Sequence, residues 1–147
     1  MRHPGNLPEM QRPLPEGSMY ALNFYSSLFA DSLRQGVKTV TIRLGNKMDK
    51  YRDGQVVWIT VGRRFGTRRK IFPAIIDRVE VKRLAEVTPR EIERDNPQLR
   101  RHEDLVDFLS KIYGQPVTLD DEVSVIYFSR IEEGPPGADQ QPAGGLG

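Results

Sequence analysis

The segment GVKTVTIR, residues 36–43, decides how the rest of the chain is interpreted. Apolar and polar side chains alternate along it, which is typical of a strand with one buried face. Val40 and Ile42 fall on one face of that strand. The other face carries three polar side chains, Thr39, Thr41 and Arg43. On this pattern alone, the polar row is either the solvated side of a half-buried strand or the lining of a site.

The elements around this strand follow from periodicity, caps and turns. The sequence predicts strands over residues 19–24, 39–43, 55–62, 69–84 and 123–131, of which residues 69–84 form either one long strand or two joined at a bend. It predicts helices over residues 27–35, 88–96 and 102–113. Thr88 followed by Glu91 is a capping-box pattern, and Pro73 inside the longest strand predicts a bulge or a sheet edge. Strands dominate without regular alternation with helices. The prediction is therefore an α+β fold with a small mixed or antiparallel β-barrel of five or six strands and two or three short helices.

Composition bounds the rest of the molecule. Residues 1–18 and 133–147 are rich in Pro and Gly, so both are expected to be disordered tails around one domain over residues 19–132. The 147 residues include no cysteine and carry a formal net charge of only +2. No apolar run approaches the ~20 residues that span a bilayer. We expect a cytoplasmic protein without membrane contact, with a monomer favoured.

The charge is unevenly distributed. The segment GRRFGTRRK, residues 62–70, places five cations around Phe65, namely Arg63, Arg64, Arg68, Arg69 and Lys70. Such density suits a phosphate backbone, so these residues are candidate nucleic-acid contacts, although a solvated hairpin tip is an equally simple interpretation.

Two motifs, in this order of elements, resemble the ASCH domain family, whose small β-barrel is similar to that of PUA RNA-binding domains. GVKTVTIR matches the family's Gly-x-Lys-x-x-x-x-Arg pattern, and LVDFLSKIY, residues 105–113, matches the helix before the last strand. The first motif looks most like that of bacterial amidohydrolases that deacetylate acetylcytidine. The resemblance covers nearly all of residues 20–131.

The resemblance implies specific roles. Lys38 would be the proton acceptor, Thr41 the nucleophile and Asp95 the acid, with aspartate in place of the family's glutamate and Glu93 as the alternative acid. Candidate substrate contacts are Tyr25, Thr39 and Arg43. The reaction would need neither a metal nor a cofactor.

Geometry adds a condition, since residues three apart in a regular strand point to opposite faces. We therefore predict that Lys38 precedes the strand, in the turn after Gly36. Two hypotheses stay open: hydrolysis of the amide of a modified nucleoside, or a non-catalytic RNA-binding module that uses the cleft and the basic hairpin.

Overall fold

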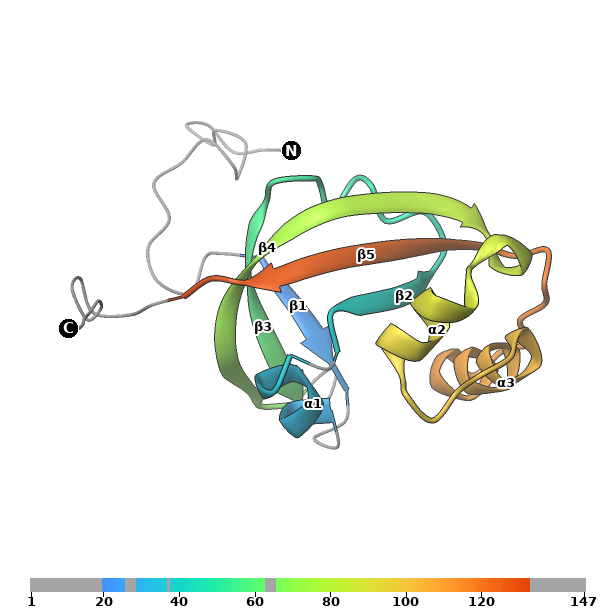
Figure 1. Cartoon of the computed structure of the whole chain (residues 1–147), viewed down its shortest axis with the longest axis horizontal. Helices are drawn as coiled ribbons and strands as arrows, with labels where there is room; N and C mark the ends of the chain where they lie inside the picture. The colour runs from blue at the N-terminus through green and yellow to red at the C-terminus, as the bar shows by residue number, and fades with distance from the viewer. Residues whose placement is uncertain (1–19, 26–28, 37, 63–65, 133–147) are drawn as a thin grey trace.

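The computed structural model describes residues 20–25, 29–36, 38–62 and 66–132. Within these ranges one curled sheet runs in the order β1-β3-β4-β5-β2, with β1 parallel to β3 and the other neighbours antiparallel (Figure 1). Its strands are β1 (Ala21–Phe24), β2 (Val40–Leu44), β3 (Val56–Gly62), β4 (Arg68–Arg83) and β5 (Glu122–Arg130). This confirms the predicted α+β class with a small barrel-like sheet. The two expected tails lie outside the described residues.

The helices follow the sequence closely where their caps are local. They are α1 (Ala30–Arg34), a 3-10 turn η3 (Leu84–Glu86), α2 (Pro89–Asp95) and α3 (His102–Tyr113). The predicted capping box is present: Glu91 N donates to the Thr88 hydroxyl at 3.1 Å, and Thr88 N donates to the Glu91 carboxylate at 2.9 Å. The first helix ends at Arg34, one residue before the predicted Gln35, and its predicted start at Ser27 lies outside the described residues.

Of the two alternatives expected at Pro73, the bulge is absent and the edge is present locally, because Pro73 lies just beyond the end of the β4–β5 ladder. Pro73 pairs with Trp58 inside the sheet, and the two irregularities of β4 fall at Ile71 and Asp77 instead. The Pro73 carbonyl accepts from Ile131 N, so its ring nitrogen also faces β5. Because the β4–β5 ladder ends at Ala74, the missing N–H removes no ladder hydrogen bond.

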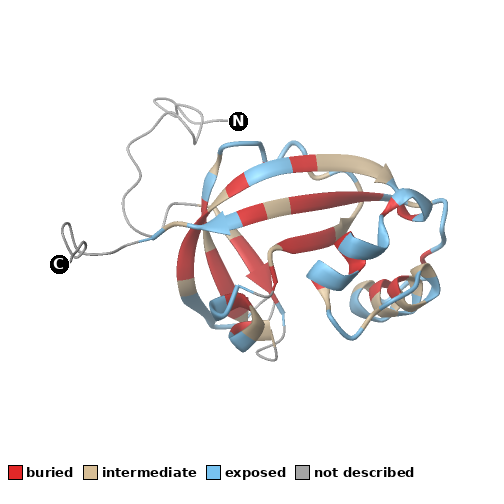
Figure 2. Cartoon of the chain, viewed as in Figure 1, coloured by how far each residue is buried: buried red, intermediate tan, exposed pale blue. Residues whose placement is uncertain are grey.

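The core consists of two clusters on opposite faces of β5, which gives Ile126 and Phe128 to one and Val123 and Val125 to the other. The first cluster also joins β1, β3 and β4 to α1, and the second also joins β2 to α2 and α3. Buried residues form continuous runs along β1, β2 and the middle of β5, as Figure 2 shows. The helices α2 and α3 are inserted between β4 and β5 in the chain, and they lie to the right of α1 in Figure 1, with α2 against β2. No helix in the described ranges is long and apolar enough to cross a bilayer.

Candidate functional site

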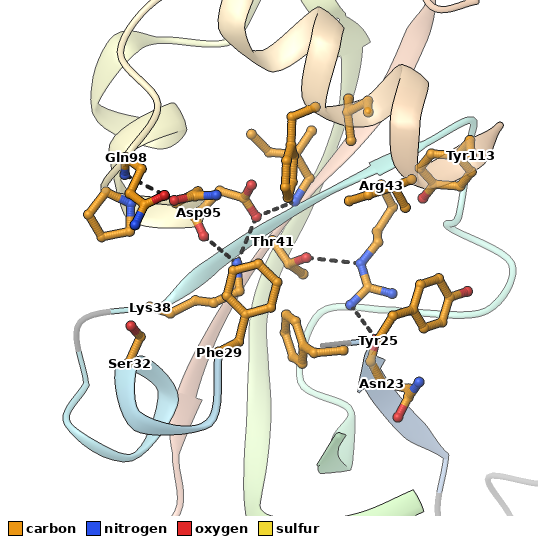
Figure 3. A pocket seen from close by; sticks show the side chains of 17 residues that line it. Asn23, Tyr25, Phe29, Ser32, Lys38, Thr41, Arg43, Asp95, Gln98 and Tyr113 are labelled. Atoms are coloured by element: carbon orange, nitrogen blue, oxygen red, sulfur yellow. Dashed lines mark hydrogen bonds and ion pairs between the residues drawn. The ribbon is translucent and has the colours of Figure 1, made fainter. Parts of the chain in front are cut away.

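A cavity of about 430 Å³ lies where β1, β2, α1 and the α2–α3 pair meet (Figure 3). Its walls combine aromatic rings with a few polar groups, which is the usual composition of a small-molecule site. The lining side chains with polar ends include Asn23, Tyr25, Ser32, Lys38, Thr41, Arg43, Asp95, Asn96, Gln98 and Tyr113. The apolar part of the wall comes from Phe24, Phe29, Ile42, Pro97, Phe108, Leu109 and Ile112.

Lys38 lies before β2, as the sequence predicted, and its side chain reaches into the cavity. The residue is only 2% exposed. Its ammonium lies 2.7 Å from the Asp95 carboxylate, and it also donates to the main-chain carbonyls of Asp95 at 2.5 Å and of Val40 at 3.2 Å. Asp95 is the last residue of α2, so this ion pair fixes the end of that helix to the start of β2.

Burial lowers the pKa of Lys38 from the usual lysine value, because the charged form loses its hydration. The neighbouring Asp95 opposes this effect and Arg43 adds to it, and the net pKa remains lowered. The ammonium also lies 5.0 Å from the ring centroid of Phe24 and 4.9 Å from that of Phe29. These rings favour the cation but supply no hydrogen bond, so a proton on Lys38 is held mainly by Asp95.

Thr41 faces the same cavity from the middle of β2 and is almost fully buried. Its hydroxyl oxygen accepts a hydrogen bond from Arg43 Nε at 2.9 Å, which leaves the hydroxyl hydrogen available to a base. Arg43 also donates from Nη2 to the main-chain carbonyl of Asn23 at 3.0 Å. Figure 3 shows Lys38, Thr41 and Asp95 turned toward the same space. Lys38 and Thr41 therefore face the same cavity and do not lie on opposite sides of the sheet.

The other predicted substrate and acid residues divide into two groups. Tyr25 lies at the cavity mouth, with 49% of its surface exposed. Thr39 does not line the cavity, and its hydroxyl accepts from Arg94 instead. Glu93 is exposed on the outer side of α2, so the alternative acid is not in the site, whereas Asp95 is. Helix phase separates these two, because Asp95 shares a face with the buried Ile92 three residues before it.

Sequence analysis missed Asn23 of β1, which positions Arg43. The Asn23 side chain accepts from the Thr60 hydroxyl at 2.7 Å and donates to the Gly62 carbonyl at 2.9 Å. This holds β1 against β3, while the Asn23 carbonyl positions Arg43. The only available sequence signal was a polar residue inside an otherwise apolar strand, and it did not identify the partners.

A second, more open hollow lies where β3 and β4 approach the basic segment. It is lined by Tyr25, Val61, Gly62, Gly66, Thr67, Arg68 and Arg69. Tyr25 borders both this hollow and the main cavity. Lys70 lies outside it, 4.6 Å from the ring centroid of Trp58. Arg63 and Arg64 lie outside the described residues.

No group of three or more potential metal ligands among His, Cys, Asp and Glu occurs in the described part of the chain. The side chains that line the cavity offer hydroxyl, amine, carboxylate, guanidinium, amide and phenol groups.

Several solved structures share this fold. The ASCH domain of Lactobacillus crispatus JV V101 superposes with a TM-score of 0.56 at 14% identity, over 77% of this chain and 80% of that one. Protein EF3133 of Enterococcus faecalis V583, assigned to the family DUF984, gives 0.59 at 15% identity over 77% and 80%. Hypothetical protein PH0355 gives 0.57 at 16% identity over 77% and 99%. The chain has an ASCH-like fold. No protein-family model and no curated protein matches its sequence.

Proposed function

We propose that the cavity binds the acylated exocyclic amine of a nucleoside such as acetylcytidine and that the chain hydrolyses this amide. The observation that carries the proposal is that Lys38 and Thr41, from the segment around the start of β2, and Asp95, from the end of α2, all line one cavity. A volume of about 430 Å³ falls in the range of about 300–1,000 Å³ that is usual for small-molecule sites. Aromatic walls suit a planar heterocycle.

The first step requires a neutral amine at Lys38. Transfer of its proton across the 2.7 Å contact to Asp95 gives an amine and a carboxylic acid, and burial of Lys38 favours this neutral form. The Thr41 oxygen then bonds to the acyl carbon, its proton moves to Lys38, and the carbonyl electron pair moves onto the acyl oxygen. The hydrogen bond from Arg43 stabilises the charge that develops on the Thr41 oxygen.

The second step releases the amine. The C–N bond breaks, and the leaving nitrogen takes the proton from Asp95, which restores the original ion pair and leaves an ester on Thr41. Water repeats the sequence: its proton goes to Lys38, the ester C–O bond breaks, and Asp95 returns a proton to the Thr41 oxygen. The products are the free amine and a carboxylic acid, which ionises in water.

The test is turnover of acetylcytidine to cytidine and acetate by the full chain, followed by chromatography. Thr41→Ala should reduce kcat by at least about 10²-fold, because it removes the nucleophile. Thr39→Ala is the matched control, since Thr39 lies on the same segment outside the cavity, and it should keep wild-type turnover. Absence of wild-type turnover, or equal rates for Thr41→Ala and wild type, would refute the hydrolysis.

A second candidate function is a non-catalytic RNA-binding module. It is favoured by the hollow at Arg68 and Arg69, which adjoins the cavity through Tyr25, a side chain placed to stack on a base. Binding of single-stranded RNA should weaken as salt rises and should lose part of that salt dependence in Arg68→Gln/Arg69→Gln. Affinity that is independent of salt would exclude this function.

A further inference from the structure

The cavity contains an unbalanced positive charge. Three charged side chains line it, Lys38, Arg43 and Asp95. Lys38 and Asp95 neutralise each other across 2.7 Å. No ion pair joins Arg43 to a carboxylate anywhere in the described ranges. The lining therefore carries one net positive charge, and the group that carries it is the Arg43 guanidinium.

Arg43 is held in a fixed orientation by uncharged partners. Its Nε donates to the Thr41 hydroxyl and its Nη2 to the Asn23 carbonyl, so both bonds lie on one edge of the guanidinium. Its Cζ lies 5.0 Å from the ring centroid of Phe24, which packs against one face. Among the described residues, no hydrogen bond is made by Nη1. The Nη1–Nη2 end of the fork is thus available to a ligand in the cavity.

A partly buried cation with apolar neighbours is costly unless an anion accompanies it. The fork geometry of arginine matches the two oxygens of a carboxylate, and a single negative charge is what the lining lacks. We infer that Arg43 is a carboxylate receptor, and that it binds the acyl oxygen as it becomes negative and then holds the carboxylate product. This inference rests on the proposed amide hydrolysis for its catalytic part, whereas carboxylate binding by the resting protein does not need turnover.

The position of Arg43 next to the nucleophile supports this role. An acyl carbon bonded to the Thr41 oxygen carries its own oxygen only one bond further on, beside the guanidinium that already contacts Thr41 at 2.9 Å. In the attack the carbonyl π pair becomes a lone pair on that oxygen, and the new charge faces Arg43. Donors placed where charge develops lower the barrier more than donors to the neutral substrate do.

The binding test uses the full chain with sodium acetate and sodium benzoate, against sodium chloride at equal ionic strength. Isothermal titration should show saturable carboxylate binding by wild type. Arg43→Gln should weaken it at least tenfold, and Arg43→Lys should weaken it less, because lysine keeps the charge without the fork. Arg94→Gln is the matched control, since Arg94 is a nearby arginine outside the cavity, and its affinity should equal that of wild type.

Three results would overturn the inference: no saturable carboxylate binding by wild type, equal affinity in Arg43→Lys and wild type, or tighter binding of inorganic phosphate than of acetate.

A kinetic experiment distinguishes failure of the carboxylate site from failure of the proposed hydrolysis. In a hydrolytic wild type, acetate should inhibit as a product, Arg43→Gln should raise its inhibition constant at least tenfold, and Arg43→Lys should raise it by a smaller factor. Undiminished turnover and product inhibition in Arg43→Lys would refute the role of Arg43 alone. Absence of wild-type turnover with Arg43-dependent acetate binding would refute the hydrolysis and support the carboxylate site.

Discussion

Removing one member of the Lys38–Asp95 pair should destabilise the protein strongly. Both side chains are almost fully buried, and their charges lie 2.7 Å apart. At an effective dielectric constant of about 20, that separation corresponds to an attraction of about 6 kcal/mol, which is offset by a desolvation cost of several kcal/mol for each ion. Lys38→Met keeps the desolvation cost of Asp95 and loses the attraction. We therefore expect it to lower the free energy of unfolding by about 3–5 kcal/mol.

The double variant Lys38→Met/Asp95→Leu should recover part of this loss, because it removes both charges. It does not recover all of it, since the carbonyls of Val40 and Asp95 each lose the donor that Lys38 provided, and Ile42 N loses its acceptor on Asp95. At about 1 kcal/mol for each hydrogen bond, the double variant should lie about 3 kcal/mol below wild type. The single variants would then not add, and the difference would measure the coupling between the two side chains.

Urea unfolding followed by the fluorescence of Trp58, the single tryptophan, measures these free energies. The exposed pair between Arg83 and Asp120, at 3.3 Å, is the control, and Arg83→Gln should cost less than about 1 kcal/mol. A Lys38→Met variant as stable as the control would refute the argument. The argument would also be refuted if the double variant lost as much unfolding free energy as the two single variants lose together, or more.

Three further predictions concern single positions. Burial lowers the pKa of Lys38, so between this lowered pKa and the unfolded-state value of about 10.4 the unfolded chain binds more protons than the folded one. The free energy of unfolding should therefore rise with pH across that window. Urea midpoints should show this rise in wild type and not in Lys38→Met. Tyr127→Phe removes a hydrogen bond to the buried Glu91 carboxylate and should cost about 1–3 kcal/mol by urea unfolding. Gly114→Ala places an alanine at φ +66° after α3 and should cost about 1–2 kcal/mol, with Gly114→Asn less affected by the same measurement.

Features that depend on neighbouring residues could be predicted from the sequence. The capping box at Thr88 and the apolar stripe of α3 each require contacts within a few residues, and both are present. The two faces of β2 followed from alternation in the same way. The resemblance then added Asp95, which is distant in sequence and which periodicity alone marked only as the residue at the end of a helix.

Contacts set by the sheet order could not be predicted. Glu91 was identified only as a helix-capping residue, yet it is buried, contacts Lys82 of β4 at 3.0 Å and accepts a hydrogen bond from Tyr127 of β5. Burial raises the pKa of Glu91, but the hydrogen bonds from Thr88, Tyr127 and Lys82 outweigh it, and the net pKa is lowered. Nothing local in the sequence indicates that these two strands are neighbours beneath α2, because their pairing spans the inserted helices.

Two acidic residues of α2 show how the helices inserted between β4 and β5 are attached to the sheet beside the cavity. Glu91 and Asp95, one helical turn apart, attach the same face of α2 to the sheet, the first through Tyr127 and Lys82 and the second through Lys38. Tyr127 pairs across the sheet with Val40, the residue whose carbonyl also accepts from Lys38. The two attachments therefore meet at the start of β2, where Lys38 leaves the strand pattern. A lysine one residue later would take the place of Thr39, which directly precedes β2 and lies outside the cavity. The point at which β2 begins therefore decides whether the lysine shares the cavity with Thr41.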